Sequence, residues 1–341
     1  ADWVGLREVK KSTTYRIIRD GNPQANSRGV DHGVMVEVLA DGQFGYYGCN
    51  NLDHGSIANA AEKALQQAKF LYFAQKAGHT GALDPIATGV LPICFGEGTK
   101  FSHFLLNADK KYRVIAKMGQ KTTTADREGE VVEEKPVNVT EEELVKVVQQ
   151  FKGTISQVPS MYSALKKDGV PLYKLARQGI EVEREAREVT IHSIDIVRFE
   201  DDEFELDVHC SKGTYIRNLV EDMGDELGCG AHVQELRRTA VSHLQLDDCV
   251  SLTQLETMKQ ADEKLAMDEL LLPLEKALHH LPIVELDSDQ AYYIRLGQAV
   301  QLSGMPQEEE FILKDPEGFL GIGCIDDDGK VAPRRLIKQT S

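Results

Sequence analysis

The stretch Gly78-His-Thr-Gly-Ala-Leu-Asp-Pro85, continued by Ile86-Ala-Thr-Gly-Val-Leu-Pro92, decides how this chain is interpreted. Its three glycines and its closing proline indicate a tight loop that can approach a ligand closely and hold Asp84 in one place. An aspartate before a proline is, taken alone, more often a helix N-cap with proline at the first helical position. The surrounding glycines favour the loop.

Asp84 in such a loop has a possible chemical role. A carboxylate can act as a nucleophile if a nearby cation keeps it ionised in a drier pocket. Arg217, at the end of Lys212-Gly-Thr-Tyr-Ile-Arg217, is a candidate for that cation. The alternative is an exposed helix cation that pairs with Glu221 four residues further on. The sequence leaves both open.

Length and composition are those of an ordinary folded protein. At about 150 residues per domain, 341 residues indicate two or three domains, with 41% hydrophobic and 28% charged residues. No run approaches the roughly 18 apolar residues that a membrane helix needs. The first residues, Ala1-Asp-Trp3, show no basic and apolar pattern of a secretory signal. We therefore expect a cytoplasmic protein with no membrane partner.

Cysteine and histidine patterns argue against a metal. The cysteines are spread along the chain without a C-x-x-C pair, which favours reduced, packed thiols over disulfides or a zinc knuckle. They are Cys49, Cys94, Cys210, Cys229, Cys249 and Cys324. No H-E-x-x-H, G-x-S-x-G or P-loop motif is present either. We predict no metal site.

A local basic run stands out in an acidic chain. The formal net charge is −16, which argues against a nonspecific nucleic-acid binder. Between Gly98 and Lys121, however, the chain holds six basic residues and only one acidic residue, Asp109. An anionic partner would bind there, although lysines that protect a strand edge against aggregation are the simpler interpretation of charge alone.

Hydrophobic periodicity predicts an α+β fold. It indicates a hairpin over 32–49, a helix from Ser56 to Gly78, and another from the capping box at Thr140 to Gly153. A strand over 204–209 precedes a helix over 214–227, and a second capping box at Ser251 opens more helix. Short strands follow at 283–286, 299–302, 311–313 and 319–325. We expect a mixed, largely antiparallel sheet and a small C-terminal β-rich domain.

Five blocks together make the chain recognisable. In order, they resemble the TruB family of tRNA pseudouridine synthases: His79-Thr-Gly-Ala-Leu-Asp84-Pro, Asp109-Lys-Lys-Tyr112-Arg-Val, Gln157-Val-Pro-Ser-Met-Tyr-Ser-Ala-Leu-Lys166, Gly213-Thr-Tyr215-Ile-Arg217 and Glu235-Leu236-Arg-Arg-Thr239. The resemblance covers about residue 64 to the end. It implies a catalytic domain of pseudouridine synthase type over 64–250, then a helical linker and a PUA-like domain over 251–341.

The resemblance implies that the chain isomerises uridine to pseudouridine at position 55, in the T-loop of tRNA, as a monomer that binds the T-arm and needs no cofactor. Asp84 would be the nucleophile, attacking either the ribose anomeric carbon or the uracil ring. Arg217 would pair with Asp84 before the substrate arrives, and Tyr112 would stack on the flipped uracil.

Further binding residues follow from the same resemblance. Tyr215 and the backbone of Leu236 would contact the base, and His79 would lie in the RNA-binding loop. The basic run, Lys110 and Lys111 above all, would then contact phosphates, which supply most of the affinity for folded RNA.

Residues 1–63 depart from this family. Its members open with a strand and a Lys-Pro-x-Gly-x-Ser-Ser stretch that is absent here. Instead, the stretches beginning at Trp3, Ser27 and Val38 resemble the N-terminal region of TldD/PmbA-type metallopeptidases, without that family's zinc-binding helix. The alternative function is therefore a tRNA-binding protein that has lost isomerase activity because this segment is replaced. A peptidase-accessory module attached to an RNA-binding body is a more distant one.

Overall fold

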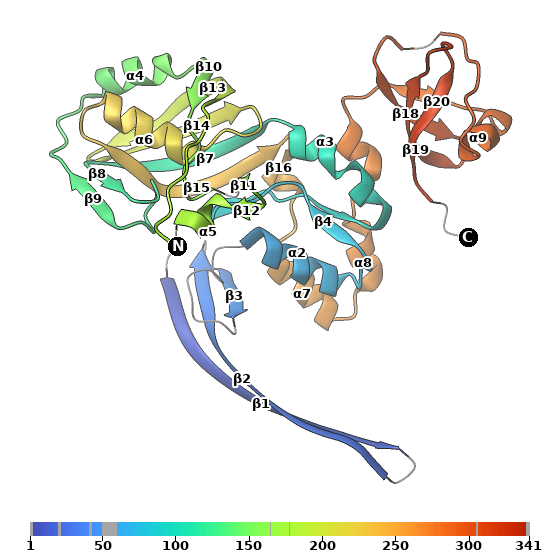
Figure 1. The fold of residues 1–341 in the computed structure, drawn as a ribbon, viewed down its shortest axis with the longest axis horizontal. Helices are drawn as coiled ribbons and strands as arrows, with labels where there is room; N and C mark the ends of the chain where they lie inside the picture. The colour runs from blue at the N-terminus through green and yellow to red at the C-terminus, as the bar shows by residue number, and fades with distance from the viewer. Residues whose placement is uncertain are drawn as a thin grey trace.

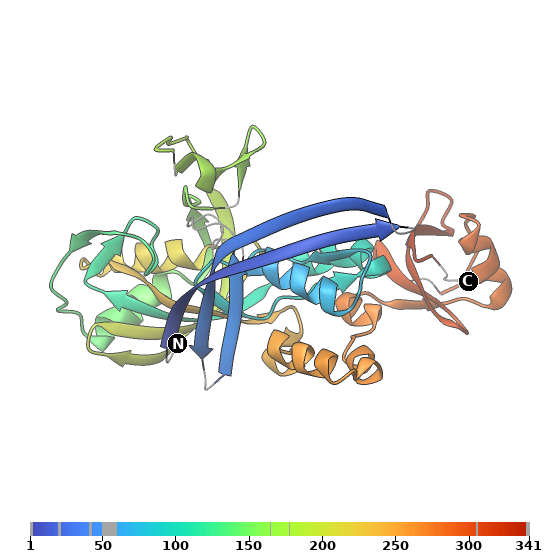
Figure 2. The same ribbon diagram turned by 90° about the horizontal axis from the view of Figure 1, so that it is seen from below.

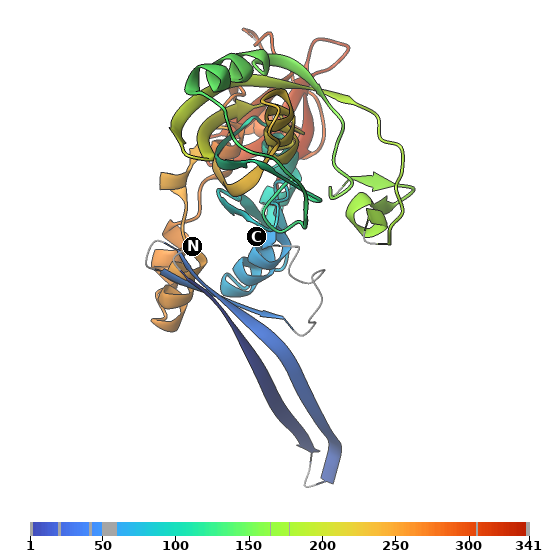
Figure 3. The same ribbon diagram turned by 90° about the vertical axis from the view of Figure 1, so that its left-hand side faces the viewer.

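The structure is a computed structural model that describes residues 3–19, 22–40, 43–49 and 60–338, except 164, 177 and 305. Near the N-terminus, β1 (Trp3–Arg19), β2 (Asn22–Ala40) and β3 (Gln43–Cys49) form an antiparallel sheet in that order. The expected hairpin over 32–49 is the pairing of β2 with β3, although its turn at 41–42, like Ser56, lies outside the described residues. The ribbon of β1 and β2 projects away from the rest of the chain (Figures 1 and 3).

The centre of the fold is a seven-stranded sheet. Its order is β10-β13-β14-β7-β15-β16, and β5 also pairs with β15. Only the β5–β15 pairing in this sheet is parallel. The strands are β10 (Gly153–Gln157), β13 (Arg187–Glu200), β14 (Glu203–Cys210), β7 (Lys110–Met118), β15 (Ala231–Val241), β16 (Leu244–Gln245) and β5 (Ala87–Gly89). The predicted mixed, largely antiparallel α+β fold is confirmed.

Two helices cover one face of this sheet. The helices α4 (Glu141–Gln150) and α6 (Ile216–Glu226) place their apolar sides against it. Alternate residues of β7 and β14 are buried, as expected where one sheet face is packed and the other is solvated. The outer face carries charged side chains, among them Lys111 and Arg113 on β7.

Local signals placed these elements correctly. The capping box at Thr140 is present, with its hydroxyl accepting from the Glu143 amide, and α4 follows it. The predicted strand over 204–209 is β14, and the predicted helix after it is α6. At the second predicted helix start, the Ser251 hydroxyl accepts from the amide of Gln254, and α7 (Leu252–Gln260) follows.

The segment that leads to Asp84 and leaves it is built from short elements. They are α2 (Ala60–Leu71), β4 (Ala77–His79), β6 (Ile93–Phe95), the 3₁₀ helix η1 (Gly96–Phe101) and α3 (Ser102–Asn107). Because β4 pairs with β6, the two ends of the Asp84 loop are joined. The remaining small pieces are β8 (Gln120–Thr122), β9 (Val131–Glu134), β11 (Lys166–Lys167), β12 (Val170–Pro171) and α5 (Leu172–Ala176). The β11–α5 part projects from the central sheet (Figure 2).

The C-terminal part has its own core. After η2 (Leu246–Asp248), α7, α8 (Lys264–Glu269) and η3 (Leu274–Leu278), a four-stranded sheet β17-β18-β19-β20 packs with α9 (Ser288–Arg295). It stands apart from the central sheet in Figure 1. The strands are β17 (Ile283–Glu285), β18 (Glu310–Asp315), β19 (Gly318–Ile325) and β20 (Val331–Leu336). The predicted small C-terminal β-rich domain is confirmed.

One strand in this domain was predicted wrongly and another was missed. Residues 299–302 make only an isolated bridge, from Val300 to Val331, instead of a strand. The strand β20 carries Pro333, Arg334 and Arg335 and gives no apolar alternation, yet proline and charge are typical of an edge strand. Among the described residues, no helix has the length and apolar character needed to cross a membrane.

Candidate active site

The Asp84 loop is a turn fixed to the central sheet. The Ala87 amide donates to the Asp84 carbonyl oxygen over 2.9 Å, and β5 then pairs with β15, Ala87 opposite Leu236. Residues 84–86 do not begin a helix, so the helix N-cap alternative for Asp84 is wrong. At Gly89 the φ angle is +101°, and a Cβ would lie 2.1 Å from the Arg238 carbonyl oxygen. Only glycine fits this approach of β5 to β15.

Arg217 binds both carboxylate oxygens of Asp84 through one edge of its guanidinium group. Its Nε donates to Asp84 Oδ2 over 2.9 Å, and its Nη2 donates to Asp84 Oδ1 over 3.0 Å. The sequence left open whether Arg217 pairs with Asp84 or is an exposed helix cation, and in the structure it pairs with Asp84. The Arg217 side chain is 4% exposed and that of Asp84 is 31% exposed. The buried Arg217 guanidinium therefore binds the Asp84 carboxylate, while part of the Asp84 side chain remains exposed to solvent.

Other acceptors fix the Arg217 guanidinium. Its Nη1 donates to the Thr124 carbonyl oxygen over 3.1 Å and to Asp126 Oδ2 over 3.4 Å, and its Nη2 also donates to the Tyr162 carbonyl oxygen over 3.2 Å. Two carboxylates therefore share one buried arginine. The two bonds from Arg217 fix the position and orientation of the Asp84 carboxylate.

Sequence reasoning missed Asp126. Its side chain is buried, and Oδ1 accepts from the Thr124 hydroxyl over 2.6 Å and from the Glu128 amide over 3.1 Å. Asp126 lies outside all five motif blocks, between β8 and β9, so nothing in the sequence marked it. A buried carboxylate with these three partners positions Arg217, which in turn positions Asp84.

Tyr112 lies close to this pair on β7. Its side chain packs against the core that also contains Leu236. Burial raises the pKa of Tyr112 to about 12, the Asp84 charge adds to this rise, and the neighbouring Arg238 opposes it. The phenol therefore stays neutral at physiological pH, and the side chain is half-buried.

Arg238 joins the two sides of the Asp84 loop. This side chain is 2% exposed. Its Nε donates to the Val90 carbonyl oxygen over 2.7 Å, and its Nη1 donates to the Ala82 carbonyl oxygen over 3.0 Å. Because Ala82 precedes Asp84 and Val90 follows it, Arg238 holds the loop at both ends. The residue stands in the last motif block, but its spacing alone did not assign it this role.

Tyr215 and Leu236 complete the surroundings of Asp84. Tyr215 is the residue before α6, and its backbone amide and carbonyl both bond to the Gln157 side chain, over 3.0 and 3.2 Å. Burial raises the pKa of Tyr215, and the Asp84 charge adds to the rise. Leu236 is buried on β15 between Ala87 of β5 and Val114 of β7. The structure thus brings together Asp84, Arg217, Tyr112, Tyr215 and Leu236.

The remaining predicted residues lie apart from this group. His79 ends β4, opposite Ile93 of β6. Lys111 is exposed on the outer face of β7. Lys110 is buried instead, and its Nζ donates to the carbonyl oxygens of Leu106 and Ala108 over 2.7 and 2.5 Å. Burial lowers the pKa of Lys110 to about 8.

Lys110 therefore acts as a cation at the C-terminal end of α3. A buried ammonium bound by two backbone carbonyl oxygens does not favour a phosphate contact, so the predicted role of Lys110 is not supported. The basic run is also partly neutralised. Arg113 pairs with Asp207, Lys117 with Asp202 and Lys121 with Asp225 at 2.7, 2.8 and 2.9 Å, respectively.

Comparisons with known proteins agree with this geometry. The N-terminal domain of TruB family pseudouridylate synthases matches residues 69–216, and two TruB C-terminal domains match residues 217–279 and 282–337. Domain 1 of PmbA/TldA metallopeptidases matches residues 4–68, in agreement with the resemblance of the N-terminal segment.

Curated relatives cover most of the chain. A protein called tRNA pseudouridine synthase B from Vibrio parahaemolyticus is 52% identical over 82% of this chain and 91% of its own. The protein of that name from Vibrio cholerae is 53% identical over 82% of this chain and 92% of its own. A solved structure described as an H/ACA RNP bound to a substrate RNA containing 2′-deoxyuridine has a similar fold, with a TM-score of 0.62, 20% identity, and 82% and 81% of the two chains covered.

The matched domains and the curated relatives define the class of this chain, which is that of a pseudouridine synthase. At this level of identity and coverage, the chain belongs to the TruB family of pseudouridylate synthases.

Proposed function

We propose that this chain isomerises uridine to pseudouridine at position 55, in the T-loop of tRNA. The observation that carries the proposal is the two-bond pair between the buried Arg217 and the partly exposed Asp84. Relatives that share about half of their residues with this chain are named for activity on tRNA. Domain 64–250 would carry the chemistry, and domain 251–341 would add RNA-binding surface.

Asp84 acts as the nucleophile. The reaction breaks the bond between C1′ of the ribose and N1 of uracil, turns the base, and forms a bond between C1′ and C5. N1 gains a proton and C5 loses one, so the product is an isomer of the substrate and no cofactor or metal takes part. Attack at C1′ and attack at the uracil ring both need an ionised carboxylate with an open side, which Arg217 supports.

The target base must leave its stack to reach Asp84. Tyr112 stacks on the flipped uracil, while Tyr215 and the backbone of Leu236 contact its edge. All three positions lie around Asp84, since the charge of this aspartate affects the pKa of both tyrosines and Leu236 pairs with Ala87. A neutral Tyr112 suits stacking on a neutral base.

The rest of the tRNA is held by its backbone. Lys111 contacts phosphate on the outer face of β7, and His79 contributes to the RNA-binding loop. The protein acts on the T-arm as a monomer, in the cytoplasm.

Tritium release tests this proposal. Transfer RNA carrying uridine labelled with tritium at C5 loses the label as the C1′–C5 bond forms. We expect the wild-type chain to release tritium and Asp84→Asn to release none, while both bind tRNA equally. Release at the wild-type rate by Asp84→Asn would overturn the role of Asp84. A wild-type chain that binds tRNA without release would instead be the alternative protein, one that has lost isomerase activity.

A further inference from the structure

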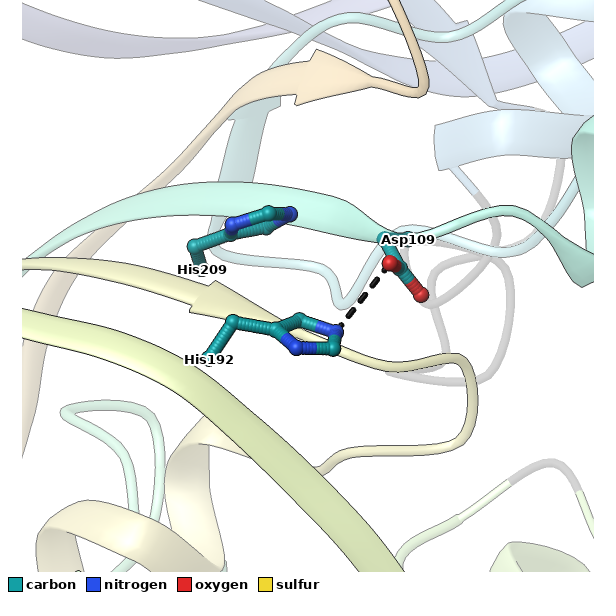
Figure 4. A group of neighbouring side chains, drawn as sticks. All are labelled: Asp109, His192 and His209. Carbon is teal, nitrogen blue, oxygen red and sulfur yellow. Dashed lines mark ion pairs between the residues drawn. The ribbon is translucent and has the colours of Figure 1, made fainter. Parts of the chain in front are cut away.

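A cluster of potential metal ligands lies on the outer face of the central sheet. Asp109 Oδ2 lies 3.1 Å from His192 Nε2, and the rings of His192 and His209 are 4.7 Å apart between centroids (Figure 4). One ligand atom from each of the three residues lies within 4.8 Å of the other two. None of the three takes part in the chemistry proposed for Asp84.

The sheet brings these residues together from distant parts of the sequence. His209 on β14 lies opposite Lys111 of β7, and Asp109 immediately precedes β7. The register of β13 against β14 shifts between Ile191 and Ser193, so His192 is the extra residue of a β-bulge. A bulge redirects the side chain that it carries. Here it lets His192 meet both Asp109 and His209.

We propose that Asp109, His192 and His209 bind a divalent transition-metal ion of the zinc class. Two imidazoles and one carboxylate suit zinc and its neighbours better than magnesium or calcium, which prefer oxygen ligands. Three protein ligands leave one position for water. Tetrahedral ligands about 2.0–2.1 Å from zinc lie about 3.3 Å from one another. The cluster therefore needs to close by only about 1.5 Å at its widest separation.

Nearby charged groups both oppose and favour a bound cation. The Lys111 ammonium opposes a second cation, and the Asp109 carboxylate offsets it. A bound ion would fix Asp109, which immediately precedes β7 and stands three residues before Tyr112, to β13 and β14.

The sequence-based expectation of no metal relied on linear spacing. Motifs such as C-x-x-C and H-E-x-x-H detect ligands on one local element. Ligands on β13, on β14 and before β7 have no such spacing, and the bulge at His192 is not visible in the sequence.

Zinc binding to the purified, metal-free full chain tests the site. Titration with zinc alone, measured by calorimetry, should give one tight site per chain. His192→Ala and His209→Gln should each weaken it by at least about tenfold, and the double variant should abolish it. Circular dichroism and thermal unfolding of the metal-free variants should match the wild type, since all the replaced groups are on the outer face.

His243→Gln is the matched control. His243 and His279 form another close histidine pair, with ring centroids 3.8 Å apart, on a different part of the chain. This variant should keep the affinity of the wild type. Equal zinc affinity in wild type and in the double variant, no saturable zinc binding to the wild type, or loss of the site in His243→Gln would each overturn the proposal. Zinc affinity is measured independently of isomerase activity, so a negative result would overturn the metal site without affecting the function proposed for Asp84.

Discussion

Replacing Arg238 by methionine removes the group that holds both ends of the Asp84 loop. Methionine occupies a similar volume but donates no hydrogen bond, so the carbonyl oxygens of Val90 and Ala82 lose their bonds of 2.7 and 3.0 Å. The Asp84–Arg217 pair itself is unchanged in composition. The variant therefore tests whether the position of Asp84, and not only its charge, matters for catalysis.

The expected magnitudes follow from these contacts. A hydrogen bond to a charged group contributes about 1.5–3 kcal/mol, so two of them give about 3–6 kcal/mol. Loss of a buried charge returns part of its desolvation penalty, which leaves a decrease of about 2–4 kcal/mol in the free energy of unfolding. A displacement of Asp84 by about 1 Å would slow the reaction about 100-fold. This is about 2.7 kcal/mol in activation free energy.

Single-turnover tritium release with saturating enzyme measures the chemical step, and urea unfolding measures stability. Because Arg238 is only 2% exposed, we expect the tRNA dissociation constant to stay unchanged while the rate constant falls. Arg237→Met is the matched control, since Arg237 is the exposed neighbour on the same strand. A wild-type rate constant in Arg238→Met, or an equal fall in Arg237→Met, would refute the reasoning.

Three further predictions concern other parts of the structure. Gly89→Ala should lower the free energy of unfolding in urea by at least about 3 kcal/mol, because its Cβ would lie 2.1 Å from a backbone oxygen of β15; Gly179→Ala, with nothing within 4 Å, should cost much less, and equal losses would contradict this. Lys111→Glu should weaken tRNA binding and reduce the salt dependence of that binding. Lys110→Met should lower the stability of the fold and leave the salt dependence unchanged. The opposite pattern in binding titrations would contradict the assignment of Lys111 as the phosphate contact. Burial raises the pKa of Asp222 from 3.8 to about 6. The folded state therefore favours the neutral carboxyl, and the stability that this gives is lost as the pH rises through 6. Asp222→Asn should therefore stabilise the protein above pH 7, by on the order of 1 kcal/mol after solvent screening, and little below pH 4; a difference that does not vary with pH in urea unfolding would contradict this.

Local patterns in the sequence predicted much of the fold. The capping-box sequences that begin at Thr140 and Ser251 and the alternation over 204–209 act within a few residues. The helices α4 and α7 and the strand β14 were therefore expected. The strand β20 was not, because its stability comes from pairing with β19 at the edge of a sheet and not from its own composition.

The site shows the same division. The motif blocks led to Asp84 and Arg217, which the structure joins. Asp126 could not be assigned, because it lies outside every motif block and meets Arg217, 91 residues away, only in the fold. Arg238 stands in a motif block, but its bonds to the carbonyl oxygens of Val90 and Ala82 are not visible in the sequence. Alternation alone separates Lys110 from Lys111 by face, but it does not reveal that the carbonyl oxygens at the end of α3 accept the Lys110 ammonium.

The replaced N-terminal segment bears on activity through α2. The PmbA/TldA match ends at residue 68 and the TruB match begins at residue 69, so the junction falls inside this one helix. Its end is held by the C-terminal helices: the Tyr72 hydroxyl donates to the Met267 carbonyl oxygen over 2.9 Å, and Lys259 Nζ donates to the Leu71 carbonyl oxygen over 2.8 Å.

The C-terminal end of α2, which leads to His79, is thus fixed by residues of the TruB part of the chain. The bonds that position Asp84 come from Arg217 and from the clamp that Arg238 places on its loop, and both arginines also lie in that part. Among the described residues, a change before residue 69 can reach the nucleophile through α2, whose end the C-terminal helices already hold. Loss of isomerase activity does not follow from the replaced segment, and the comparisons give that alternative no support.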